Sequence, residues 1–155
     1  MADHLRTAIF DAIATKLREI DGFTAVGKVK RGRTRSIPQE LLPAITPTWA
    51  DDDERATVRP SSGPAGEDGY DRTLPISLIV HLRDADPEEE FDRLCVSIEA
   101  KMAEVIKLPG ASIETVLQST RFFVERETGL PLMTGRLVYL ATYKTLAADP
   151  TASAL

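Results

Sequence analysis

The sequence predicts an α+β fold: a two-layer sandwich in which two helices pack on one face of an antiparallel sheet of about four strands. Three observations predict it. Residues 3–21 and 86–107 carry apolar side chains at spacings of three and four. Residues 73–83 alternate in the manner of a strand with one buried face. The order of elements, which is helix, two weak strands, long loop, strong strand, long helix and two strands, suits such a sandwich.

Length and composition set the broad class. The chain has 155 residues, which is the size of one domain. Its 24 acids and 19 bases give a net charge of −5, which argues against a dedicated duplex-DNA binder. One cysteine cannot form an internal disulfide or a cysteine-rich zinc site. With no signal-peptide core and no apolar run of ~18–20 residues, we expect a soluble protein of cytosolic type and no membrane partner.

The first half of the chain reads as one helix followed by weak strands. Asp3 is the expected N-cap of the 3–21 helix, and Gly22 the expected stop. We expect a short strand over 24–30, a basic turn over 31–36 and a proline-bearing edge strand over 41–49. Residues 50–72 are rich in acids, proline and glycine, so they are predicted to be a mobile loop.

The second half begins with the strongest signals. Asp86, Pro87 and Glu89 open the 86–107 helix in a capping pattern, and the Pro109-Gly110 pair is expected to end it. Residues 113–116 fit either a helical turn or the start of a strand. Strands are predicted over 119–127 and 136–145, with a turn region at 128–135 between them. We therefore expect one domain over 1–146, followed by a flexible tail over 147–155.

The candidate chemistry is sparse. His4 and His81 have no neighbouring ligand at metal spacing, and Cys95 lies in the apolar stripe of the second helix. The acidic run 51–54 suits a solvated surface better than a chelate, because adjacent residues of an extended chain point in opposite directions. Glycine-rich phosphate loops and nucleophile elbows are missing from the sequence. We therefore predict no catalytic, cofactor-binding or metal-binding residues, and no enzyme.

A basic segment is the main feature left to explain. Lys28, Lys30, Arg31, Arg33 and Arg35 place five positive charges in eight residues with no acid between them. Phosphate contact, a protein contact and a bland solvated surface all remain open at this point. Without interleaved aromatic residues, nucleic-acid binding would be weak and without sequence preference. The segment lies between two weak strands, where a hairpin tip would project, and it could meet an acidic surface on a neighbouring subunit.

The order of elements resembles a family of small phage proteins over most of residues 4–146. The features that carry the resemblance are the helix from Leu5 to Ile20, the Leu42–Ile45 extension, the Leu74–Val80 strand leading into an acidic-capped helix, and the closing strand Leu137–Tyr143. Together they resemble the tail terminator, or tail completion, proteins of long-tailed bacteriophages and gene transfer agents. That family includes the minor tail protein U of phage lambda.

This resemblance implies a structural virion protein. Family members form a hexameric ring on the last ring of the tail tube, end tube polymerisation and offer the other face to head-completion proteins, while DNA passes through the lumen without specific binding. It implies a place in the neck of the virion tail, after assembly in the host cytoplasm. The residues assigned by hypothesis to the subunit or tail-tube interface are Arg31, Arg33, Arg35, Asp51, Asp52, Asp53, Glu54 and Tyr70.

Three alternatives remain beside this reading. Another head–tail connector protein would bind a portal-proximal partner in place of the tube protein. A nucleic-acid-binding module using residues 28–35 would lose affinity steeply with salt. A small enzyme would need a polar pocket, and the sequence does not indicate one.

Overall fold

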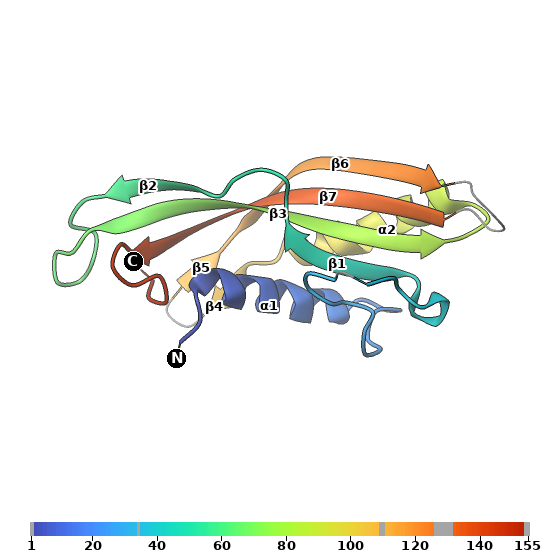
Figure 1. Ribbon diagram of the computed structural model, residues 1–155, viewed down its shortest axis with the longest axis horizontal. Helices are drawn as coiled ribbons and strands as arrows, with labels where there is room; N and C mark the ends of the chain where they lie inside the picture. The colour runs from blue at the N-terminus through green and yellow to red at the C-terminus, as the bar shows by residue number, and fades with distance from the viewer. Residues whose placement is uncertain (1, 34, 109–110, 126–131, 154–155) are drawn as a thin grey trace.

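The computed structural model describes residues 2–33, 35–108, 111–125 and 132–153. It confirms the α+β class, with two α-helices on a mostly antiparallel sheet (Figure 1). The elements in chain order are α1 (Leu5–Arg18), the 3-10 turn η1 (Gln39–Leu41), β1 (Ala44–Trp49), β2 (Arg55–Arg59), β3 (Gly69–Arg83), α2 (Pro87–Met102), β4 (Ile106–Leu108), β5 (Ala111–Ile113), β6 (Thr115–Glu125) and β7 (Leu132–Leu146).

Two long strands form the spine of the sheet. β3 and β7 pair antiparallel along their whole lengths, from Gly69 opposite Leu146 to Arg83 opposite Leu132. β6 flanks β7, while β1 and β2 both lie on the other side of β3, one along each half of it. The large sheet therefore has five strands where about four were expected, and β4 and β5 add a separate two-stranded sheet.

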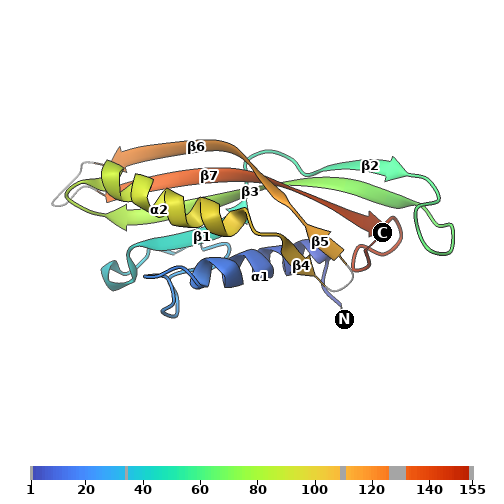
Figure 2. The same ribbon diagram turned by 180° about the vertical axis from the view of Figure 1, so that it is seen from behind.

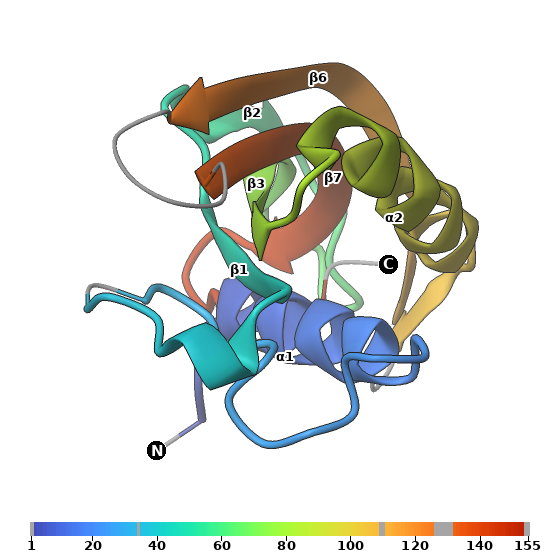
Figure 3. The same ribbon diagram turned by 90° about the vertical axis from the view of Figure 1, so that its right-hand side faces the viewer.

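The core lies between this sheet and the helices, which both cover one face (Figures 2 and 3). The apolar stripe of α1 is buried as its spacing predicts, because i, i+3 and i+4 positions share a helix face. Alternate residues of β3 from Leu74 to Leu82 meet both helices in one cluster. The buried residues of α2 are Phe91, Cys95, Ile98 and Met102.

Two N-terminal predictions are wrong in detail. The N-cap of α1 is His4 and not Asp3, with the His4 Nδ1 accepting a hydrogen bond from the Arg6 N–H at 3.0 Å. Residues 24–30 form turns with a single parallel bridge from Val29 to Ile45, and no strand. Gly27 has φ +89°, a conformation that interrupts an extended chain.

The segment 50–72, which was predicted to be a mobile loop, contains β2 and the first residues of β3. β2 pairs with the first residues of β3, from Arg55 opposite Thr73 to Arg59 opposite Gly69, and closes a hairpin. Ala56 and Val58 alternate with the polar residues of β2, but this run has five residues only and all of them are exposed. Most of the prolines and glycines of the segment lie in the turn at 60–68, and Gly69 begins β3.

The second helix ends earlier than expected. α2 stops at Met102, and Ile106 starts β4 in place of a fifth helical turn. Asp86 is the N-cap with Pro87 at the first helical position, as predicted, but its side chain makes no capping bond. Residues 113–116 fitted either a helical turn or the start of a strand. Of these, Ile113 ends β5, and Thr115 and Val116 begin β6. Pro109, Gly110 and 128–131 of the expected turns lie outside the described residues, while 132–135 belong to β7.

The C-terminal residues also differ from the predicted loose tail. The Leu5 N–H donates to the Pro150 carbonyl at 3.0 Å, and the Leu146 N–H donates to the Ala152 carbonyl at 3.1 Å. These bonds hold the 147–153 segment against the start of α1 and the end of β7. The predicted edge strand is confirmed as β1, which meets one strand of the sheet, β3.

Candidate assembly surfaces

A buried carboxylate organises the centre of the molecule. The Glu54 side chain is 8% exposed. It accepts two hydrogen bonds from the Arg6 guanidinium, at 3.1 and 2.7 Å, one from Arg72 at 3.1 Å and one from the Tyr143 hydroxyl at 2.8 Å. We call these four residues the Glu54 cluster. A carboxylate offers about four acceptor sites, so these bonds occupy all of them.

The electrostatics of the cluster follow from this pairing. Burial alone would raise the pKa of Glu54, but the hydrogen bonds from Arg6, Tyr143 and Arg72 outweigh it and hold that pKa below its ordinary value. Burial first, and then the bond to Glu54, raise the pKa of the Tyr143 phenol. The carboxylate is therefore ionised and fully engaged, which suits a structural tie and not a general base.

Aromatic rings extend the cluster toward the surface. The Arg6 guanidinium lies 4.6 Å from the centroid of the Trp49 ring, and the Arg72 guanidinium 5.3 Å from that of Tyr70. Tyr70, which the sequence assigned to an interface, thus contacts an arginine of its own chain and is half-buried. The cluster ties α1, the end of β1, the start of β2, β3 and β7 together at one point.

The β2–β3 hairpin projects from this point (Figures 1 and 2). Every β2 residue is exposed, including Val58 at 56%. In the turn, the Ser61 N–H donates to the Asp68 carboxylate at 3.0 Å, and the Ala147 N–H donates to the Asp68 carbonyl at 2.9 Å. β2 therefore has two open faces, whereas the β3 strand of the hairpin pairs with β7 as far as Leu146.

The opposite edge of the sheet is β6, a surface that the sequence analysis missed. Its exposed apolar side chains are Val116, Leu117, Phe122 and Phe123. Phe122 reaches inward to Phe91, with ring centroids 6.2 Å apart, and Phe123 lies under the Arg121 guanidinium at 4.5 Å. Two adjacent phenylalanines on one strand point to opposite faces, so one of them had to face solvent or a partner. That doublet was the available signal.

The basic segment does not project as a hairpin tip, which corrects that expectation. Its backbone runs beside β1, with bonds from the Lys30 N–H to the Ile45 carbonyl at 3.2 Å and from the Gly32 N–H to the Pro47 carbonyl at 3.0 Å. The Arg31 guanidinium lies 4.0 Å from the centroid of the Phe10 ring, and the Arg33 Nη2 donates to the Gly27 carbonyl at 2.6 Å. Among the described residues, no carboxylate neutralises these arginines.

Arg33 and Arg35 instead border a small hollow of about 170 Å³, which we call the basic hollow. Its lining residues are Gly27, Lys30, Arg33, Arg35, Ser36, Ile37, Pro38 and Leu41. Three of its side chains are cationic and none is acidic. Positive charge is therefore concentrated there without a counter-charge from the described part of the chain.

The acidic run 51–54 divides between two sides of the sheet. Glu54 belongs to the buried cluster, whereas Asp51 pairs with Arg136 of β7 at 2.9 Å. Asp52 and Asp53 are exposed and border a hollow of about 250 Å³ together with Arg55, Thr73, Pro75, Gln118 and Leu140. In the part of the chain that the structure describes, no ion pair joins this run to Arg31, Arg33 or Arg35.

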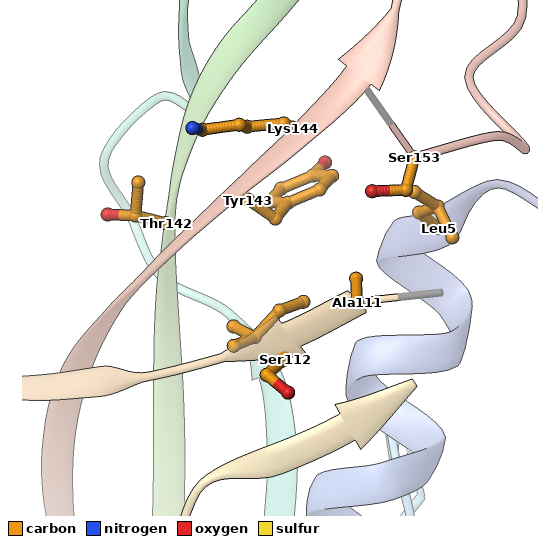
Figure 4. A pocket seen from close by; sticks show the side chains of 8 residues that line it. Leu5, Ala111, Ser112, Thr142, Tyr143, Lys144 and Ser153 are labelled. Atoms are coloured by element: carbon orange, nitrogen blue, oxygen red, sulfur yellow. The ribbon is translucent and has the colours of Figure 1, made fainter. Parts of the chain in front are cut away.

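A third hollow, of about 230 Å³, lies near the free end of β7 (Figure 4). It is lined by Leu5, Ala111, Ser112, Ile113, Thr142, Tyr143, Lys144 and Ser153. The Tyr143 ring extends toward Ser153 and Leu5, whereas the Lys144 side chain extends to the other side of the strand. Because the Tyr143 hydroxyl is engaged by Glu54, this hollow presents mostly apolar walls.

Two further candidate residues, Cys95 and His81, lie in environments typical of residues with a structural role. Burial, together with Glu99 and Asp92, raises the pKa of the Cys95 thiol to about 11, so it is a packed thiol and not an activated nucleophile. His81 shares a hydrogen bond with Thr46 at 3.3 Å. Among the described residues, no three His, Cys, Asp or Glu side chains are grouped to hold a metal ion, and no helix is long and apolar enough to cross a membrane.

The chain matches no protein-family model, and it matches no curated protein.

Proposed function

We propose that this chain is a structural virion protein, a tail terminator, which caps the tail tube of a long-tailed bacteriophage as a ring. In this role it ends tube polymerisation and forms the joining surface for the head. Its partners would be further copies of itself in a hexamer, the major tail tube protein and a head-completion protein. DNA would pass through the lumen without specific binding, and the protein would lie in the neck of the virion after assembly in the host cytoplasm.

One observation carries the proposal: the sheet offers two unlike open edges on opposite sides. β2 lies on the β1 side of β3, and β6 lies beyond β7. A closed ring needs heterologous contacts, in which one surface of a subunit meets a different surface of the next. Open strand edges are natural material for such contacts, because their backbone donors and acceptors lack partners. The irregular segment at 28–32 already covers β1, which leaves β2 and β6 for that purpose.

The apolar character of β6 supports the same conclusion. Val116 is 66% exposed, and Phe122 and Phe123 are about two-fifths exposed. A long apolar edge strand promotes aggregation if it stays uncovered. Such a strand therefore suits a subunit whose edge is covered by a neighbour in an assembly. The Glu54 cluster supports the proposal as well, because it ties the start of β2 to α1 and β7.

The proposal is tested by mixing the purified chain with the major tail tube protein of the same phage and imaging the tubes by negative-stain electron microscopy. We expect rings at one tube end and shorter tubes as the chain is added. Tubes of unchanged length with no bound chain would refute the proposal. Binding to portal-proximal proteins with no effect on tubes would identify another head–tail connector.

A second candidate is a nucleic-acid-binding module, which the uncompensated positive charge of the basic hollow favours. It predicts duplex-DNA affinity that falls steeply with salt. Fluorescence anisotropy with a labelled duplex at two salt concentrations separates this candidate from the terminator.

A further inference from the structure

Arg33 leaves a hydrogen-bond donor unused at the basic hollow. Its Nη2 donates to Gly27, but its Nη1 is buried and has no hydrogen-bond partner among the described residues. Burial lowers the pKa of this guanidinium, although an arginine stays charged at neutral pH. A buried donor without a partner destabilises a protein by about 1–3 kcal/mol, and a charged one by more. Because Arg33 also lines the hollow, its positive charge adds to those of Lys30 and Arg35 there.

The hollow has the composition of an anion site. Lys30 and Arg35 are exposed cations on its rim, and Arg33 lies deeper. From Gly22 to Gln39 the chain carries no acid, so the charge is not balanced locally. Hydrogen bonds between guanidinium groups and oxyanions are short and about twice as strong as neutral ones.

We propose that the basic hollow is a carboxylate-binding site that takes Asp52 and Asp53 of a second copy of this chain. The inference rests on the ring of the proposed function and names one contact within it. Of the four acids in the run, Asp51 and Glu54 are paired inside their own subunit. Asp52 and Asp53 are exposed, and the ion pairs of the described residues do not include them.

The two surfaces lie at different places on one subunit, as a heterologous contact requires. The basic hollow is formed by the irregular segment beside β1, whereas Asp52 and Asp53 follow β1 and border a hollow over β3, β6 and β7. A subunit can therefore give its acids to one neighbour and its hollow to the other. Such complementary charges mainly fix the register and speed the encounter of the partners.

The lining of the hollow favours a protein carboxylate over nucleic acid. Ile37, Pro38 and Leu41 give it apolar walls, and the residues that line it include no aromatic ring on which a base could stack.

The test exchanges charges between the two surfaces. One variant carries Lys30→Glu and Arg35→Glu, and a second carries Asp52→Lys and Asp53→Lys; Arg33 is left intact because it bonds to Gly27. We expect each variant alone to self-associate about tenfold or more weakly than the native chain at physiological salt. An equimolar mixture of the two should recover association, because each reversed surface then meets a complementary one. Sedimentation velocity measures association in solution, and electron microscopy measures ring occupancy on tail tubes.

Matched controls separate this contact from a general charge effect. Glu88→Lys with Glu89→Lys makes the same charge change as Asp52→Lys with Asp53→Lys, at exposed positions of α2, and it should leave association unchanged. Unaltered rings in both test variants would overturn the contact while leaving the terminator function standing. A native chain that forms no oligomer, free or on tubes, would refute the contact too. Loss of duplex-DNA binding in Lys30→Glu/Arg35→Glu, with normal association, would assign the hollow to phosphate.

Discussion

At the scale of single residues, a close contact in the core joins a strand and a helix. Gly135 in β7 has no side chain because the Phe91 ring of α2 occupies the space. A Cβ built on Gly135 would lie 2.1 Å from the Phe91 Cε1 atom. Glycine inside a strand often marks such a close approach and not a need for conformational freedom. This contact sets how near α2 lies to the sheet.

Gly135→Ala is expected to destabilise the protein by about 1–3 kcal/mol, because the added methyl group forces Phe91 or α2 to move. Urea unfolding followed by circular dichroism measures the change. Phe91→Leu lowers stability by itself, yet it should reduce the cost of adding Gly135→Ala, which a double-mutant cycle reveals. An alanine variant as stable as the native chain would show that the helix does not rest on this glycine.

At the scale of elements, the β2–β3 hairpin is held by charge and hydrogen bonds rather than by apolar burial. All of β2 is exposed, so the hydrophobic effect contributes little to its position. Glu54, directly before β2, connects the hairpin to α1 through Arg6 and to β7 through Tyr143. Glu54 therefore anchors the start of β2, while the pairing of β3 with β7 holds the other strand of the hairpin.

Glu54→Gln is expected to destabilise the protein by about 3–5 kcal/mol, because it leaves two arginines partly buried without their counter-charge. Hydrogen exchange should show faster exchange in residues 55–59 and 69–73 than in the native chain. Asp51→Asn is the matched control, since its carboxylate is 88% exposed and its pair with Arg136 contributes about 0–1 kcal/mol. Equal effects of the two substitutions would contradict the anchoring role of Glu54.

At the scale of the whole molecule, the ionisable groups predict loss of stability in acid. Burial lowers the pKa of both His4 and His81 below the ordinary 6.5, with nearby arginines adding to the effect. The pKa of Glu54 is also held below its ordinary value of 4.5. In each case the unfolded chain takes up a proton at a higher pH than the folded chain does, so stability falls as pH falls.

We expect the urea midpoint to drop in two stages as the pH is lowered from 7. The first stage begins near pH 6.5 from the histidines, and the second begins near pH 4.5 from Glu54; each continues down to the folded pKa of its group. His4→Gln with His81→Gln should flatten the first stage, and Glu54→Gln should flatten the second. A midpoint independent of pH between 7 and 5 in the native chain would rule out the histidine contribution.

The sequence determined the parts of the fold whose signals are local. The stripes of α1 and α2 and the alternation in β3 follow from how far apart apolar residues stand, and this spacing does not depend on distant partners. β7 and the edge position of β1 were predictable for the same kind of reason, since apolar alternation and prolines are read along one segment. β2 was missed because its alternation covers five residues within an acid-, proline- and glycine-rich segment, and neither of its faces is buried.

The tertiary structure decided which charges are engaged. In the sequence, Asp51 to Glu54 form one acidic run and Arg31 to Arg35 one basic run. In the fold, Glu54 turns inward to Arg6, 48 residues away, and to Tyr143, 89 residues away, while Asp52 and Asp53 stay exposed. The charge of a side chain follows from its residue type. The group with which it forms an ion pair depends on strand register and on the course of the chain between β1 and β2. Strand register depends on pairing between residues that are far apart in the sequence, so it cannot be predicted from a short segment alone.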